Sequence, residues 1–335
     1  MCRAGDVEER EKKMKFKKFV SLALAAVMAA GLATGCGSPK EGTATKDEKV
    51  TVGTWKTAQT ITPYFYDEFM PESVEVLPFT NPGDQKTALL AGSLDMCGTT
   101  LVTAITAASK GEPVKIVTSL CNKCSALVVG KDSGIQSEAD LKGKRIAYVP
   151  GTMHHALLLE VLKRNNINPD TDVELKRIDF FDMGQALVNG DIDAFLSGEP
   201  YPSQAVQEGY GRILSYPYFD DSIGTINAAM IVTEETIKNK PEMVQDLVNA
   251  HVDATRMLNE DKEKWLDKSA EFGTDKALLE ISADNIELCA DIDDAFIQNT
   301  RNLADSMKEL GMIDTVPDID AMFDLSFLEQ AAKRR

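Results

Sequence analysis

The chain has 335 residues, of which 53 are Asp or Glu and 36 are Lys or Arg, so its net charge at pH 7 is −17. This acidic excess argues against binding to nucleic acid and against broad contact with anionic lipid headgroups. A chain of this length buries a large core and divides into more than one unit, so we expect two lobes. We expect the protein to be a monomer.

The first residues predict export. Three lysines between positions 15 and 18 precede an apolar run at 19–33, which gives way to small residues before Cys36. A basic stub, a short apolar core and small residues at its end are typical of a signal peptide. The run is also shorter than the roughly 20 residues that a membrane-spanning helix needs. A buried apolar helix that ends at a free cysteine is the alternative.

Leu32-Ala33-Thr34-Gly35-Cys36 resembles a bacterial lipobox, which implies cleavage before Cys36 and attachment of lipid to its sulfur. We therefore expect residues 1–35 to be a signal peptide. Within it, residues 1–13 fit no export signal, which favours Met14 as the true start. Residues 36–48 are small and polar and are expected to form a lipidated tether. The expected location is extracytoplasmic, with the protein lipid-anchored to the bacterial cell membrane at the cell surface or in the periplasm.

A faint internal repeat is the most informative pattern in the rest of the chain. Residues 88–95 (ALLAGSLD) return as 186–193 (ALVNGDID), an offset of 186 − 88 = 98. Three further matches share this offset: Asp84 with Asp182, Gly53-Thr54 with Gly151-Thr152, and Gly111 with Gly209. The period is too long for a solenoid, so we expect two related α/β units.

Each unit is expected to run strand, Gly-Thr turn, helix, strand, helix, strand, with Asp84 and Asp182 as helix N-caps. The expected strands are 50–52, 74–77, 94–97 and 114–118 in the first unit and 145–149, 173–177, 192–196 and 212–215 in the second. Alternating strands and helices predict an α/β fold in which each lobe is a mostly parallel sheet flanked by helices. One continuous doubly wound domain is the alternative.

The last third of the chain is expected to be helical. After a strand at 227–232, apolar residues recur at helical spacing over 241–258, 262–272, 276–288 and 291–310. We expect these helices to pack against the first lobe as a helical C-terminal extension.

Several short pieces, taken in their order and spacing, resemble a known family. They are Gly53-Thr54-Trp55, residues 88–99 (ALLAGSLDMCGT), 110–117 (KGEPVKIV), 140–147 (DLKGKRIA), 150–152 (PGT) and 198–201 (GEPY). Together they make the stretch 50–214 similar to the substrate-binding components of nitrate, sulfonate and taurine ABC importers. The same family includes binders of thiamine pyrimidine precursors.

This resemblance implies a two-lobed periplasmic-binding-protein fold of type II, in which two crossing strands join the lobes and hinge motion closes them on a ligand. The crossings are expected near 119–125 and 221–227. Lobe 1 is expected to combine residues 48–122 with 226–335, and lobe 2 to span 125–222. The implied partners are a small-molecule ligand, an ABC permease with its ATPase, and the membrane through the lipid anchor.

Candidate ligand-binding residues in lobe 2 follow two of its strands. Thr152 stands between a strand and a helix, where unpaired N–H groups and the positive end of the helix dipole attract oxyanions. The resemblance assigns this Gly-Thr turn to ligand binding. Met153 and His154 come next, and Glu199 follows a later strand end, where a carboxylate suits an amine. A packed histidine and a carboxylate that stabilises a helix start are the alternatives.

Lobe 1 offers a matching set. Thr99 and Thr100 follow a strand and precede a helix, and Trp55 and Thr57 follow the first strand. An apolar platform with hydroxyls suits an organic ligand better than bare nitrate. An ordinary N-cap and a core tryptophan are the alternatives.

Cys121 and Cys124 lie on the first predicted crossing as a CxxC pair. We expect either a hinge disulfide or a pair that lines the cleft. With no second CxxC and few histidines, no metal site is predicted.

The sequence contains no GxSxG, Walker or HExxH motif, so we predict no catalytic residue, no cofactor and no enzyme activity. The expected function is capture of a small organic anion, such as an alkyl or aryl sulfonate, by hinge closure. The alternatives are a binder of a nitrogen heterocycle such as a thiamine pyrimidine precursor, a lipoprotein ligand sensor, and a pyrimidine synthase-like enzyme.

Overall fold

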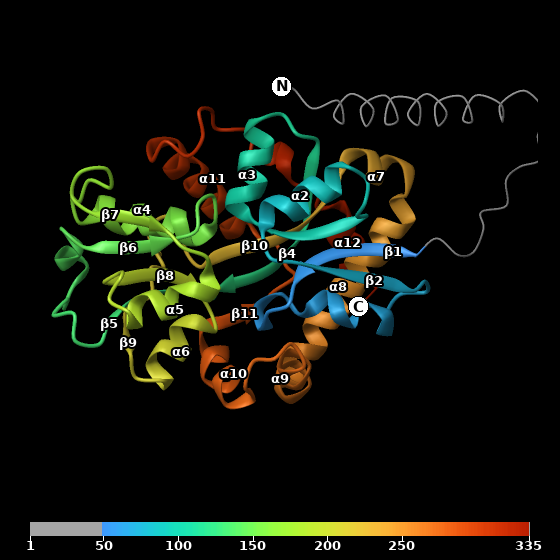
Figure 1. Ribbon diagram of the computed structural model, residues 1–335. Coiled ribbons are helices and arrows are strands. Elements are labelled where there is room, and N and C mark those ends of the chain that lie inside the picture. Colours follow the sequence, from blue (N-terminus) through green and yellow to red (C-terminus); the bar gives the residue numbers. More distant parts are fainter. Residues whose placement is uncertain (1–48, 335) are drawn as a thin grey trace, which may run out of the picture. The chain divides into compact units, whose positions relative to one another are not determined.

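The computed structural model describes residues 49–334, which form two β-sheets with helices packed around them (Figure 1). The predicted signal peptide, tether and lipidated Cys36 lie outside these residues. The first sheet has six strands in the order β11-β4-β10-β3-β1-β2. Their bounds are β1 Val50–Trp55, β2 Val74–Phe79, β3 Met96–Thr100, β4 Val114–Lys123, β10 Ile226–Thr233 and β11 Ile286–Leu288.

The second sheet has five strands in the order β7-β6-β8-β5-β9. Their bounds are β5 Ser125–Gly130, β6 Arg145–Tyr148, β7 Glu174–Arg177, β8 Ala194–Gly198 and β9 Gly211–Ser215. We keep the names lobe 1 and lobe 2, with the boundaries proposed above, for the units built on the first and second sheets. In Figure 1 the green and yellow elements of lobe 2 lie to the left of the blue strands of lobe 1.

The two sheets share one arrangement. β4-β10-β3-β1-β2 in lobe 1 corresponds to β9-β5-β8-β6-β7 in lobe 2. In each sheet the three strands at one end, β3-β1-β2 or β8-β6-β7, are parallel. The strand that arrives from the other lobe, β10 or β5, is antiparallel to both its neighbours. The sheets are therefore mixed. Each contains the predicted parallel strands, but the crossing strand from the other lobe adds antiparallel pairs that the sequence did not predict.

Helices cover both sheets. Their bounds are α2 Pro82–Leu90, α3 Leu101–Ser109, α4 Met153–Arg164, α5 Phe180–Val188, α6 Tyr201–Gln207, α7 Glu234–Asn239, α8 Pro241–Glu260, α9 Lys262–Ala270, α10 Lys276–Ser282, α11 Asp294–Glu309 and α12 Ser326–Ala332. Short 3-10 helices complete the chain: η1 Ala58–Thr60, η2 Thr62–Glu68, η3 Glu138–Leu141, η4 Ala283–Asn285 and η5 Asp320–Met322. Within residues 49–334, none of the helices combines the length and hydropathy that crossing a bilayer requires.

Apolar side chains pack the helices onto the sheets. Leu247 of α8 belongs to a cluster with Val52 of β1, on one side of the first sheet. Leu101 of α3 and Leu303 of α11 belong to a second cluster, which continues into lobe 2 through Leu158 of α4. Burying each such side chain contributes roughly 1.5–3 kcal/mol. This second cluster gives the lobes a shared apolar contact.

Three local expectations were wrong. Gly53 and Thr54 lie inside β1 rather than in a turn, because β1 continues to Trp55. The N-caps of α2 and α5 are Asn81 and Asp179, each three residues before the aspartate that we expected. The helix expected over 276–288 ends at Ser282, after which the chain becomes η4 and then β11.

The chain passes between the sheets twice. Only Cys124 separates β4 from β5, and the second crossing runs from β9 to β10 over residues 216–225. Lys123 and Cys124 have φ values of 62° and 64°. Two consecutive non-glycine residues in the left-handed region are unusual. The first crossing is therefore a sharp, strained turn.

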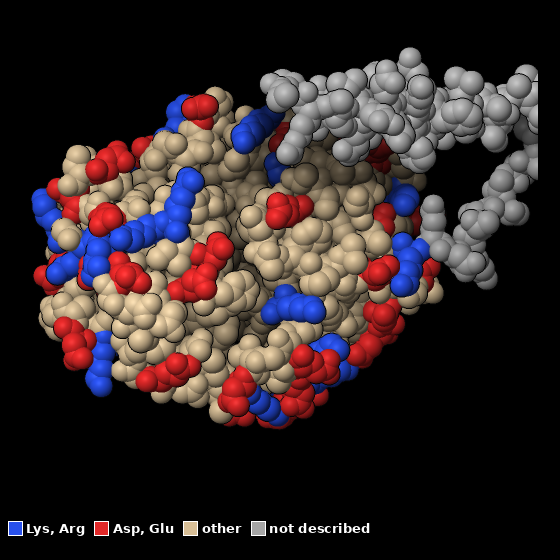
Figure 2. Space-filling view, viewed as in Figure 1, with Lys and Arg blue, Asp and Glu red and all other residues tan. Residues whose placement is uncertain are grey.

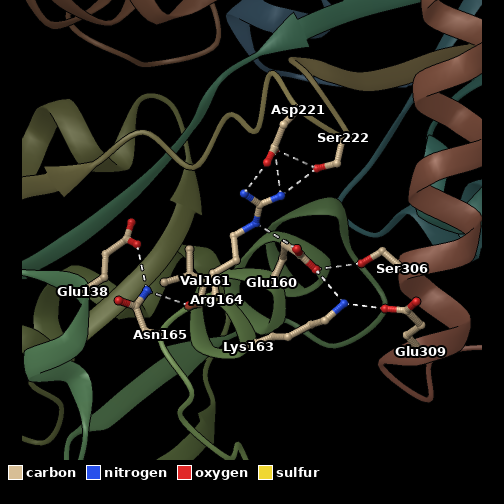
Figure 3. A network of polar contacts seen from close by, with 10 residues as sticks. All are labelled: Glu138, Glu160, Val161, Lys163, Arg164, Asn165, Asp221, Ser222, Ser306 and Glu309. Carbon is tan, nitrogen blue, oxygen red and sulfur yellow. Dashed lines mark hydrogen bonds and ion pairs between the residues drawn. The ribbon is translucent and has the colours of Figure 1, made fainter.

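A polar network ties α4 of lobe 2 to α11 and to the second crossing (Figure 3). The guanidinium of Arg164 donates to both carboxylate oxygens of Asp221 over 2.8 and 3.1 Å, and its Nε donates to Glu160 over 2.9 Å. Glu160 also accepts from Ser306 of α11 over 2.9 Å. α4 follows its N-cap Thr152 and ends at Arg164 in this network, so one helix connects the Gly-Thr turn at 151–152 with the second crossing.

Candidate functional site

A cavity of about 440 Å³ lies between the two lobes. Figure 2 shows a hollow between the lobes that is bordered mostly by uncharged residues, while charged side chains gather on the outer surfaces. The cavity is lined by Trp55, Lys56, Thr57, Gln59, Thr60, Pro78, Phe79, Thr80, Pro82, Thr100, Cys121, Cys124, Thr152, His154, Phe180, Phe181, Gly198, Glu199, Tyr201, Asn227, Ala228 and Phe272. Both lobes supply these residues.

The lobe 1 wall follows the ends of β1 and β3. Trp55 ends β1, and Thr57 is the residue before η1. Thr100 is the N-cap of α3, and its hydroxyl accepts from the backbone N–H of Thr103 over 3.3 Å. The hydroxyl of Thr57 lies 2.8 Å from that of Thr60. These threonines therefore have partners of their own while they line the cavity.

Thr152 is the N-cap of α4 and faces the cavity from lobe 2. Its hydroxyl accepts from the N–H of His155 over 3.2 Å and donates to the carbonyl of Val149 over 2.8 Å. Gly151 supports this turn with a φ of +72°, which only glycine adopts at little cost. The Thr152 hydroxyl is thus engaged by its own helix start.

His154 lies in the first turn of α4 and is 9% exposed. Its Nδ1 is 3.0 Å from the hydroxyl of Ser125, and its ring meets that of Phe180 edge to face at 5.3 Å. Burial lowers the pKa of His154 to about 4, so the imidazole is neutral at pH 7. A neutral imidazole provides one donor and one acceptor rather than a positive charge.

Glu199 is the carboxylate of the cavity wall and is 1% exposed. One oxygen accepts from the N–H of Ser203 over 3.2 Å and the other from Nδ2 of Asn285 over 3.0 Å. Burial raises the pKa of Glu199, and these two hydrogen bonds oppose the rise. The backbone carbonyl of Glu199 accepts from Gln59 of lobe 1 over 3.0 Å, which links the lobes beside the cavity.

Cys121 and Cys124 both line the cavity as free thiols. Their position at the first crossing places them where the two lobes join. Within residues 49–334, no group of three or more His, Cys, Asp or Glu side chains is arranged to hold a metal ion.

Two candidate residues lie away from the cavity. Thr99 points to the face of β3 opposite Thr100, as successive strand residues do, and it is fully buried. Met153 packs into the core cluster between α4 and the sheet. Thr99 and Met153 therefore belong to the protein interior, although each is next in sequence to a residue that lines the cavity.

Six of the 22 lining residues are aromatic, and Trp55 is the one among them that the sequence predicted as a ligand-binding residue. The other five are Phe79, Phe180, Phe181, Tyr201 and Phe272. They come from a strand end, two helix starts and the loop after α9. They share no motif, although Tyr201 belongs to the 198–201 (GEPY) piece of the family resemblance. Lys56 supplies the one positive charge among the lining residues, and its Nζ lies 5.8 Å from the ring centre of Phe272.

A second cavity of about 470 Å³ adjoins the first and shares five lining residues with it. These are Thr80, Pro82, Thr152, Phe180 and Phe181. The remaining wall is polar and includes Asp84, Asp179 and Lys86, whose amine is paired with Glu112. The space between the lobes thus passes from an aromatic chamber to a polar one.

Comparison with known proteins matches residues 64–264 to the family described as NMT1/THI5 like. A putative aliphatic sulfonates-binding protein of Escherichia coli is 31% identical over 135 residues, which is 38% of this chain and 40% of that protein. A 4-amino-5-hydroxymethyl-2-methylpyrimidine phosphate synthase of Schizosaccharomyces pombe is 30% identical over 121 residues, which is 36% of this chain and 34% of that enzyme. The chain thus matches less than half the length of either relative.

Among solved structures, the alkanesulfonate-binding protein SsuA of Xanthomonas axonopodis pv. citri, bound to MOPS, is similar with a TM-score of 0.73 at 19% identity. The match covers 83% of this chain and 98% of that one. It confirms the predicted periplasmic-binding-protein fold. The family match covers more than half of the chain and confirms the resemblance drawn from its motifs, so this chain belongs to the NMT1/THI5-like family.

Proposed function

We propose that the protein is an extracytoplasmic solute-binding protein of an ABC importer, which captures a small organic molecule between its lobes. The observation that carries this proposal is the cavity whose walls come from both sheets, with Trp55 and Thr100 on one side and His154 and Glu199 on the other. A ligand that contacts both walls stabilises the closed arrangement over the open one. An importer that recognises the closed shape then accepts loaded protein.

A flat, nitrogen-containing ring is the ligand class that these walls favour most. Six aromatic side chains offer faces and edges for stacking. The buried carboxyl of Glu199 gains most from an N–H or amino donor, because such a partner offsets the cost of burying it. Neutral His154 adds a donor or an acceptor without adding charge.

An organic sulfonate is the second candidate. It is supported by the Escherichia coli and Xanthomonas relatives and by Lys56 in the wall. The sequence placed the sulfonate first because the helix N-termini at Thr99 and Thr152 were expected to attract an oxyanion. Thr99 is buried away from the cavity, and the Thr152 hydroxyl is bonded to His155 and Val149. We therefore reverse the order of the two candidates.

Thermal unfolding of the full-length chain with three probes tests the proposal. The probes are 4-amino-5-hydroxymethyl-2-methylpyrimidine, an alkanesulfonate and nitrate, each over a wide concentration range. A ligand of the native state stabilises it by about 2.7 kcal/mol at one hundred times its Kd. We expect the pyrimidine to raise the melting temperature in a saturable manner. A rise with the sulfonate alone selects the second candidate, and no rise with any probe counts against solute binding of either class.

Glu199→Gln provides the matched variant. It keeps the shape of the side chain but removes the acceptor charge, so we expect at least a tenfold loss of affinity for the pyrimidine. Glu208→Gln, at the exposed end of α6, is the control and is expected to bind as the wild type does. Equal losses in both variants contradict a role for Glu199.

Location and partners complete the proposal. An N-terminal lipid anchor would hold a monomeric protein at the membrane surface near a permease and its ATPase.

Mass spectrometry of the ligand released from the protein separates binding from catalysis. An unchanged probe fits a binding protein, and a converted probe identifies an enzyme. A sensor differs in its partner, which crosslinking of the loaded protein in its native membrane identifies as a receptor instead of a permease.

A further inference from the structure

Two thiols meet at the turn between the lobes. Cys121, near the end of β4, and Cys124, directly before β5, are 1% and 2% exposed, and both line the cavity. The pKa of the Cys121 thiol is raised well above its usual range, first by its hydrogen bond to the Cys124 side chain and then by burial. The fold also brings the two thiols together: Cys121 pairs with Ala228 in the sheet, and Nδ2 of the adjacent Asn227 lies 3.3 Å from the sulfur of Cys124. The cavity is their route to solvent.

The backbone between them is strained and held in place from both lobes. Lys123 and Cys124 are both left-handed, which costs free energy for residues with a Cβ. The N–H of Lys123 donates to Thr225 over 2.7 Å, and that of Cys124 donates to Asn285 over 2.7 Å. The carbonyl of Cys124 accepts from the N–H of Glu199 over 2.8 Å. The geometry of this turn is thus coupled to the second crossing and to the cavity wall.

We propose that Cys121 and Cys124 are a redox-active dithiol, and that their oxidation to a disulfide fixes the turn that joins the lobes. The co-reactant is a small-molecule or protein disulfide, such as oxidised glutathione. One cysteine thiolate attacks a sulfur of that disulfide and releases one glutathione thiol. The second cysteine then attacks the mixed disulfide, releases the second glutathione thiol and leaves the internal S–S bond. Both cysteine protons end on the released thiols or in solvent, so two electrons pass to glutathione.

The consequence is conformational. In the reduced form the left-handed turn depends on hydrogen bonds, including one from Nδ2 of Asn227 to the carbonyl of Lys123 over 2.8 Å. The same Nδ2 lies 3.3 Å from the sulfur of Cys124. A covalent bond between residues 121 and 124 maintains the turn when these hydrogen bonds open. Hinge motion then becomes slower in the oxidised form than in the reduced form.

A third thiol competes for the same partner. Cys289 follows β11, whose Leu288 pairs with Cys121 across the edge of the first sheet. A bond between Cys121 and Cys289 would join β4 to β11 within lobe 1 and leave the turn free. The proposal therefore requires the disulfide to join Cys121 to Cys124, and a disulfide from Cys121 to Cys289 would contradict it.

The test uses the full-length wild-type chain in buffers that range from reduced to oxidised glutathione. Samples are quenched with acid, free thiols are alkylated, and peptides are mapped by mass spectrometry. We expect one peptide that contains both Cys121 and Cys124 and has lost two hydrogen atoms, formed faster at alkaline pH. Amide hydrogen exchange over residues 119–127 is expected to be at least tenfold slower in the oxidised form.

Two variants serve as matched controls. Cys97→Ser removes a buried thiol that lies away from the cavity and should leave the disulfide unchanged. Cys121→Ser should leave Cys124 either free or joined to glutathione. A bond from Cys121 to Cys289, glutathione adducts alone, or no reaction at any ratio overturns the proposal, and unchanged exchange over 119–127 overturns its conformational part. None of these results depends on the ligand, so they are separate from the test of solute binding.

Discussion

Asn285 Nδ2 lies 3.0 Å from Oε1 of Glu199, and this hydrogen bond connects η4 of lobe 1 to the cavity carboxyl of lobe 2. The Oδ1 of Asn285 accepts from the hydroxyl of Tyr218, on the second crossing. Its backbone carbonyl accepts from Cys124, on the first. Asn285 does not line the cavity, yet it contacts both crossings and the buried carboxyl.

Replacing Asn285 with alanine should therefore destabilise the protein and change the titration of Glu199. Loss of buried hydrogen bonds costs about 1–3 kcal/mol where a polar partner is left unpaired. Because the Asn285 hydrogen bond lowers the pKa of Glu199, its removal should raise that pKa further. Chemical denaturation and NMR titration of the Glu199 carboxyl measure both effects. Asn259→Ala, which removes one hydrogen bond to Leu288, is the control and should leave the Glu199 pKa unchanged.

Glu199 itself should make stability fall as pH rises. Its folded-state pKa lies above the ordinary value of 4.5, so the native state binds this proton more tightly than the unfolded state does. The stabilisation that protonated Glu199 provides is complete below pH 4.5, and it is lost as the pH rises through the folded-state pKa of Glu199. Denaturation of the wild type and of Glu199→Gln over this range isolates the effect of Glu199, because His154 and His251 are present in both proteins. The stability of the wild type relative to the variant should decrease as pH rises. Parallel pH profiles of the two proteins contradict this account.

His154 should act in the opposite direction. Burial lowers its pKa from 6.5 to about 4, so protonation favours the unfolded state. Neutral His154 contributes fully to the free energy of unfolding above about pH 6.5, and this contribution is lost as the pH falls towards 4. The loss is on the order of 3 kcal/mol at its limit. His154→Gln should lose less stability than the wild type over that interval, while buried His251 contributes equally to both proteins.

Gly198→Ala should displace His154. A Cβ at Gly198 would lie 2.9 Å from Nε2 of His154, too close for both to stay in place. Overpacking of this kind costs about 1–3 kcal/mol, and the displaced ring would reduce the affinity of the cavity for its ligand. Gly130→Ala, in β5, meets no atom closer than 3.6 Å and is the matched control. Equal stability of the two variants would exclude tight packing at Gly198.

Arg164→Met should weaken the network at the end of α4. Glu160 is 6% exposed and would lose its guanidinium partner. Removing one partner of a fully buried ion pair costs about 3–5 kcal/mol, and because Arg164 is partly exposed we expect about 2 kcal/mol. Lys276→Met removes a lysine whose partners, Glu263 and Asp267, are exposed, and its unfolding free energy should be unchanged within error. Chemical denaturation compares the two.

The internal repeat was predictable because it depends on local chemistry. α2 and α5 begin at Pro82 and Phe180, and β3 and β8 at Met96 and Ala194, so each pair keeps the offset of 98. Gly92 and Gly190 end these helices with the same φ of +73°. The offset fails at β1, where Val52 and Ile146 hold equivalent positions beside β3 and β8. Gly53 therefore corresponds to Ala147, and its match with Gly151 is coincidental.

The sequence by itself determined the α/β class, the duplicated order of strands and helices, and the family, because hydrophobic period and glycine placement act over a few residues. It also placed Trp55, Thr152 and Glu199 at strand or helix ends that face one space. Only the tertiary structure decided what completes that space. Asn285 lies 86 residues from Glu199, and Phe272 reaches the wall from the C-terminal helices. Such contacts depend on how distant elements pack, and no local pattern encodes them.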